Sequence, residues 1–123
     1  MILKGGPGVA RVGIIVTTAD NAPRATQVAD NFLRIYGAKE VSVITLTEAD
    51  ANNPLVAERI KQGSSGIFLV DELEKSNMVD TLRPSGVDTL VLKAIKTIMN
   101  NGGMVAGNSG IMVIIKMISF IFL

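Results

Sequence analysis

The feature that most limits the fold of this chain is a series of four short apolar segments that alternate with longer segments of helical periodicity. The short segments are rich in Val and Ile and are bounded by Gly, Pro, Asn and Asp, a pattern that predicts buried strands. They span residues 11–18, 40–46, 66–70 and the "MVAG" at 104–107. Strands joined by helix-length connections are predicted to run parallel, because each connection returns the chain to the same end of the sheet.

Apolar residues at three- and four-residue spacing predict the helices between these strands. The predicted helices span Pro23 to Tyr36, Pro54 to Gln62 with Asn53 as the N-cap, and Val87 to Asn100, and a last apolar helix follows from Ile111. Residues 71–86 are predicted to form a connection with partial helix. The sequence therefore predicts a single α/β domain over residues 1–123, with a mainly parallel sheet between helices on both faces.

Composition excludes several classes of function. The 123 residues contain no cysteine and no histidine, and the net charge is +1. Disulfides and thiolate metal sites are therefore impossible, no basic block suggests nucleic acid, and the glycine-rich segments at 5–8 and 100–103 lack the spacing of a phosphate loop. The apolar stretch from Ile111 to Leu123 is shorter than a membrane span, and no signal peptide is evident. We expect a cytoplasmic protein without cofactor, metal, nucleic acid or membrane.

The candidate site follows the last predicted strand. In a parallel α/β sheet, functional residues lie on loops beyond the carboxyl ends of the strands, and Gly107-Asn108-Ser109-Gly110 occupies such a loop. It resembles the Gly-x-Ser-x-Gly nucleophile turn, with the second glycine displaced by one position. Ser109 is the candidate nucleophile, and Gly107, Asn108 and Gly110 are the candidate turn and oxyanion residues. A simple turn between a strand and a helix is the alternative interpretation.

A base for Ser109 is harder to find. Histidine, the usual general base, is absent from these residues. Lys116 lies seven residues further along, about 10 Å away on a helix, which is too far for a hydrogen bond. Asp71 and Glu72 follow a strand at the same edge, and we interpret them as solvated loop charges.

Four blocks of the sequence, taken in order, point to a known family. They are "GGPGVARVGIIVTTAD", "VADNFLRIYGAKEVSVITL", "ADANNPLVAERIKQGSSGIFLV" and "NNGGMVAGNSG". In this order they resemble the serine peptidase family of cyanophycinase and the bacterial aspartyl dipeptidases, and the last block resembles its Gly-Gly-Val-Ile-Ala-Gly-Thr-Ser-Ala-Gly. The resemblance covers about residues 8–113. It implies a flavodoxin-like three-layer sandwich related to the class I glutamine amidotransferases, a peptide substrate, and a nucleophile at Ser109.

The chain also differs from that family. It continues from Phe68 as "LVDELEK" where the family has Thr-Gly-Gly-Asp-Gln, and it lacks the histidine that the family carries downstream of the serine. The family's first strand is reduced to "MILK", and the strands after the nucleophile helix have no counterpart. We therefore expect a domain that corresponds to the central part of such a peptidase, truncated, degenerate and inactive as isolated.

Two alternatives stay open. In one, a histidine-bearing partner chain completes a hydrolase site in trans. In the other, the chain is a non-enzymatic oligomerising or binding module on the same fold. The apolar C-terminal segment predicts a homo-oligomer in either case, with residues from Ile114 to Leu123 in the contact.

Overall fold

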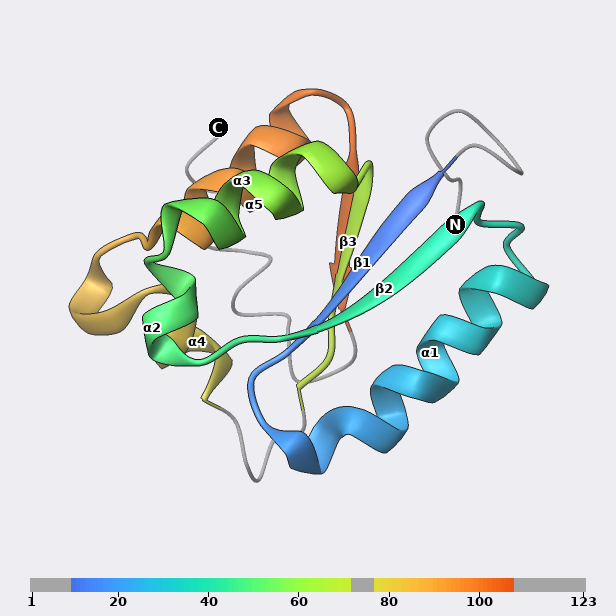
Figure 1. The fold of residues 1–123 in the computed structure, drawn as a ribbon, viewed down its shortest axis with the longest axis horizontal. Coiled ribbons are helices and arrows are strands. Elements are labelled where there is room, and N and C mark those ends of the chain that lie inside the picture. The colour runs from blue at the N-terminus through green and yellow to red at the C-terminus, as the bar shows by residue number, and fades with distance from the viewer. Residues whose placement is uncertain (1–9, 72–76, 108–123) are drawn as a thin grey trace.

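The computed structural model describes residues 10–71 and 77–107 of the chain (Figure 1). Strands and helices alternate along this part of the sequence. The strands are β1 (Arg11–Val16), β2 (Glu40–Thr45), β3 (Gly66–Leu69) and β4 (Met104–Gly107). The helices are α1 (Ala22–Arg34), α2 (Glu48–Ala51), α3 (Pro54–Gly63), α4 (Met78–Leu82) and α5 (Leu90–Asn100), with short 3-10 turns η1 (Ala19–Asn21) and η3 (Pro84–Gly86).

The four strands form one sheet in the order β2-β1-β3-β4, and every neighbouring pair is parallel. Ile15 of β1 lies opposite Ile44 of β2 on one side and Leu69 of β3 on the other, and Leu69 in turn lies opposite Gly107 of β4. This is the order of the first four strands in a flavodoxin-like sheet. The α/β class and the parallel sheet predicted from the sequence are confirmed.

Helices cover the two faces of the sheet, as Figure 1 shows. On one face α1 packs Ala25, Val28 and Phe32 against alternate residues of β1. On the other face α3, α4 and α5 pack against Ile15, Ile67 and Leu69, all of which are buried. Because β1 lies between two strands and two helical layers, all of its residues after Arg11 are buried. This explains why its sequence is continuously apolar instead of alternating.

Side-chain caps set the helix starts. Asn53 accepts a hydrogen bond from the Leu55 N–H at 3.0 Å, which confirms the predicted N-cap of α3. Thr89 caps α5 in the same way by accepting from the Leu92 N–H, so this helix starts at Leu90, three residues later than predicted. Thr47 and Asp50 form a reciprocal capping box on α2, a short helix that the sequence analysis missed. The connection with partial helix at 71–86 contains α4, as expected.

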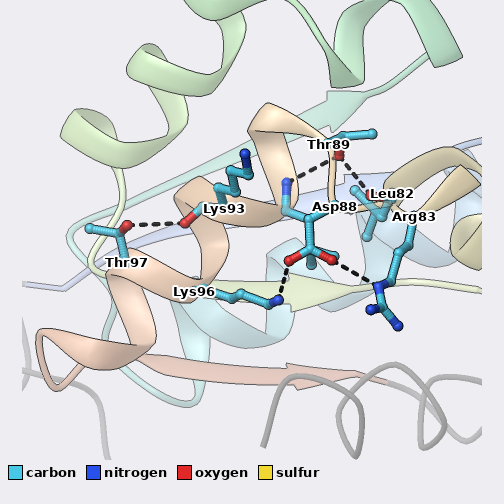
Figure 2. Close-up of polar contacts among 8 residues, drawn as sticks. Leu82, Arg83, Asp88, Thr89, Lys93, Lys96 and Thr97 are labelled. Carbon is cyan, nitrogen blue, oxygen red and sulfur yellow. Dashed lines mark hydrogen bonds and ion pairs between the residues drawn. The ribbon is translucent and has the colours of Figure 1, made fainter. Parts of the chain in front are cut away.

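An ion-pair network holds the connection between α4 and α5 (Figure 2). The Asp88 carboxylate accepts from Arg83 Nε at 2.8 Å through one oxygen and from Lys96 Nζ through the other. The Lys96 side chain is only 10% exposed. Next to it, the Thr89 hydroxyl donates to the Leu82 carbonyl at 2.7 Å, so the end of α4 and the start of α5 are tied together at two points.

Candidate functional site at the carboxyl edge of the sheet

The carboxyl ends of β1 and β3 lie side by side, and the chain leaves them toward opposite faces of the sheet. After β1 it enters η1 and α1 on one face, and after β3 it continues to α4 and α5 on the other (Figure 1). Ligands of open α/β sheets bind at this kind of switch point. Thr17 follows β1 directly, Asp71 lies two residues after β3, and Gly107 is the last residue of β4.

A pair of polar side chains joins the end of β1 to the start of α4. The Thr17 hydroxyl donates to the Asn77 side-chain oxygen, and the Asn77 amide nitrogen approaches the Thr17 carbonyl at 3.5 Å. Thr17 is 9% exposed, whereas Asn77 is exposed. Asn77 precedes α4 but makes no capping hydrogen bond to it. Its side chain is therefore used to fix the switch-point edge instead of the helix start.

Asn21 is completely buried beside this edge. It is the residue before α1, yet its side chain does not cap the helix. Neither its amide oxygen nor its amide nitrogen has a hydrogen-bond partner among the residues that the structure describes. A buried amide without partners is costly, and such groups in native proteins are usually satisfied by a water or a ligand. Asn21 is therefore a buried amide whose donor and acceptor both lack a partner among the described residues.

Asp71 is buried as well, with 1% of its surface exposed. Its interpretation as a solvated loop charge was wrong. The physical reason is that the chain keeps the direction of β3 past the end of the strand, since the Val70 N–H donates to the Ile15 carbonyl at 2.9 Å. Asp71 thus directly follows the last backbone hydrogen bond between this segment and β1, and it is buried there. This adds one carboxylate to the polar groups of the edge.

Only one of the predicted site residues lies in the described part of the chain. Gly107 ends β4 opposite Leu69, at the predicted edge of the sheet. Asn108, Ser109 and Gly110 lie outside the described residues, as do Glu72, Lys116 and the C-terminal segment from Ile111 to Leu123. Among the described residues the edge offers hydroxyl, amide and carboxylate groups. Thr17, Asn21 and Asp71 are buried, Asn77 is exposed, and none of these groups is a histidine.

Sequence analysis missed Asn21 and Asn77 as members of this edge. Asn21 stands in "ADNAP", which has the composition of an ordinary turn, and Asn77 stands in a polar connection. The one available signal was their position after the carboxyl ends of two predicted strands.

No protein-family profile matches the chain, and no curated protein sequence matches it significantly. The resemblance to the cyanophycinase family therefore rests on the sequence blocks quoted above.

In residues 10–71 and 77–107, no helix is long and apolar enough to cross a membrane. The same residues contain no group of three or more His, Cys, Asp or Glu side chains arranged to hold a metal ion.

Proposed function

We propose that the chain is a serine-hydrolase domain of the cyanophycinase type, in which Ser109 holds the nucleophile position and the 123 residues supply no general base. One observation carries the proposal. Gly107 ends β4 in register with Leu69, beside the switch point between β1 and β3. The Gly107-Asn108-Ser109-Gly110 segment therefore begins at the edge where parallel α/β hydrolases present their nucleophile.

The lack of a histidine in these residues favours a domain that does not hydrolyse a peptide efficiently. Attack by a serine hydroxyl requires a base near it with a pKa close to the working pH. The 123 residues contain no histidine, the residue that most often takes this role.

Chemical rescue tests the proposal. In buffer alone, a fluorophosphonate probe is expected to label Ser109 no more than it labels the denatured chain. Added imidazole is expected to restore labelling by taking the role of the missing base, and Ser109→Ala is the matched control. Labelled peptides are identified by mass spectrometry, so that Ser85 and the other serines are scored separately.

Each outcome of that experiment has a distinct meaning. Labelling that depends on both Ser109 and imidazole supports the proposal. Strong labelling of Ser109 without imidazole contradicts the absence of a base. If imidazole produces no labelling that Ser109→Ala abolishes, the serine is only a turn residue and the hydrolase assignment is wrong. Recovery of a histidine-bearing partner from the native source, with labelling restored in the complex, identifies the natural base.

A second candidate function, a non-enzymatic oligomerising module, has its own support. On the face that α1 covers, Phe68 of β3 and Met104 of β4 are only partly buried, whereas Ile67 and Leu69 on the opposite face are buried by the α5 layer. In the described part of the chain, α1 is the one helix on that face. Apolar surface is therefore left beside it, and the apolar segment from Ile111 to Leu123 follows the same edge strand in sequence.

This second candidate predicts a homo-oligomer with residues from Ile114 to Leu123 in the contact. Burial of several apolar side chains, at about 25 cal/mol per Å², is large enough to hold two copies together. Light scattering at micromolar concentration measures the mass. The double variant Ile118→Glu and Phe120→Glu is expected to reduce it to that of a monomer. A wild-type monomer, or an unchanged mass in the variant, contradicts the C-terminal contact.

A further inference from the structure

The outer edge of β2 is open in the described structure. β2 is the last strand on its side of the sheet, and each of its six residues is exposed or half-exposed. In Figure 1, β2 passes in front of β1, with α3 on one side and α1 on the other. No described helix or strand is drawn in front of β2. One of its apolar side chains, Val43, is 45% exposed. The edge therefore presents both unpaired backbone groups and apolar surface.

β2 carries few of the features that keep an edge strand from pairing. Natural edge strands are usually protected by Lys, Pro, a bulge or a very short length. The sequence of β2, "EVSVIT", has neither Lys nor Pro, and its one charge is at the first residue. Its register with β1 is regular from Glu40 to Thr45, without a bulge. Such a strand is a good template for another strand.

A groove runs along the same edge on the α3 side. It has a volume of about 290 Å³ and is lined by Glu40, Ser42 and Ile44 of β2 and by residues of α3 that include Val56 and Arg59. Neither the Glu40 nor the Arg59 side chain makes a hydrogen bond or ion pair with another residue in the described ranges. The groove thus combines an apolar floor with two opposite charges that are not used within one copy.

We propose that β2 pairs antiparallel with β2 of a second copy of this chain, about a two-fold axis that passes through the sheet at Ser42. The occupant is a second copy because the edge is complementary to itself. A two-fold axis perpendicular to the sheet keeps the α1 face and the α3 face of each copy on the same side. Residues that lie opposite each other across the β2–β2 contact, called the seam below, must then belong to the same face of the sheet. Because side chains alternate between the faces, this requires that the two residue numbers differ by an even number.

With Ser42 on the axis, both faces of the seam match. On the α1 face, Val41 lies opposite the partner's Val43, so the exposed valine becomes covered by an apolar neighbour. On the α3 face, Glu40 lies opposite the partner's Ile44 and enters the partner's groove, which Arg59 lines. Two Glu40 to Arg59 ion pairs form, one in each groove. The two four-stranded sheets become one continuous sheet of eight strands, and both β2 edges disappear.

The oligomeric state of edge variants tests the pairing. Val43→Lys places an ammonium in the apolar part of the contact between the two β2 strands. The dissociation constant of the dimer is therefore expected to rise at least about tenfold. Val87→Lys is the matched control, since Val87 is 66% exposed and lies in the connection between η3 and α5. Arg59→Glu is expected to weaken the dimer, and the double variant Glu40→Arg with Arg59→Glu is expected to restore it. Mass is measured by sedimentation at micromolar concentration, and circular dichroism checks folding.

Hydrogen exchange of the β2 amides separates this seam from other contacts. Protection of residues 40–45 that rises with protein concentration, together with loss of the dimer in Val43→Lys, supports the pairing. A monomeric wild-type protein overturns the proposal. So does a dimer that stays intact in Val43→Lys but dissociates in the double variant Ile118→Glu and Phe120→Glu. The β2 amides that bond to β1 are protected in a monomer as well, so the outward-facing amides are the ones that decide. Protection of these outward-facing amides that is independent of concentration also overturns the proposal, because another segment of the same chain then covers the edge. None of these results depends on the chemistry of Ser109.

Discussion

Gly103→Ala is expected to destabilise the domain by about 2–4 kcal/mol, because there is no room for a side chain at this position. A Cβ atom on Gly103 meets the Ser65 carbonyl oxygen at 2.5 Å, the Ile98 Cγ2 at 2.6 Å and the Ile98 carbonyl oxygen at 2.7 Å. Two of the three atoms belong to the backbone and have little freedom to move. The Gly103 N–H also donates to the Ile98 carbonyl at 2.8 Å, so the turn from α5 into β4 is held close to α5.

Chemical denaturation of matched variants measures this effect. Gly63→Ala is the control, because a Cβ on Gly63 has no atom within 4 Å and the residue ends a helix. The control is expected to change the free energy of unfolding by no more than about 0.5 kcal/mol, or to raise it slightly. Equal stabilities of the two variants contradict the close approach of β4 to Ser65 and Ile98.

The same turn shows what the sequence predicts and what it does not. The glycines after Asn101 predict a helix end, and Gly102 has the positive φ of 87° that such an end requires. Residue 103 must also be a glycine, because the carbonyl of Ser65 leaves no room for a side chain there. Ser65 is distant from Gly103 in the sequence. Local patterns describe the backbone at a helix end, but they carry no information about which other strand approaches it.

The candidate site was likewise predictable only in part from the sequence. Strand–helix alternation predicted the parallel sheet and located the "MVAG" strand with its carboxyl end at Gly107. The burial of Asp71 and Asn21 was not predictable, because it depends on register and on how α1 leaves β1. A charged residue after a predicted strand is usually solvated. Here one further backbone hydrogen bond, from Val70 to Ile15, continues the pairing of β3 with β1 beyond Leu69.

The second large effect is expected for Asp88→Asn, which should lower the free energy of unfolding at neutral pH by about 2–3 kcal/mol. The variant keeps the shape of the side chain but removes the charge that compensates Lys96 and Arg83. Lys96 has the larger consequence because its side chain is 10% exposed, so its ammonium is left nearly buried without a counter-charge. Asp30→Asn is the control: its ion pair with Arg34 is exposed, and a loss of no more than about 0.5 kcal/mol is expected.

The pH dependence of stability provides an independent check on Asp88. Burial by itself raises the pKa of this carboxyl, but the hydrogen bonds from Lys96 and Arg83 outweigh it and hold the pKa below its ordinary value. A group with a lowered pKa in the folded state stabilises the protein above its ordinary pKa, and this contribution is lost as the pH falls through the lowered value. The difference between wild type and Asp88→Asn is therefore expected to stay constant near neutral pH and to narrow in acid.

Removal of both charges distinguishes an ion-pair effect from a simple packing effect. If the loss in Asp88→Asn arises from an uncompensated ammonium, then Lys96→Met in the same background removes that ammonium, and an apolar chain of similar length replaces it. The double variant is then expected to regain at least about 1 kcal/mol relative to Asp88→Asn alone. Urea denaturation of the two single variants and the double variant gives the coupling energy. Additive losses, with no recovery in the double variant, contradict the network as the source of the effect and show that α5 depends on Lys96 for packing alone.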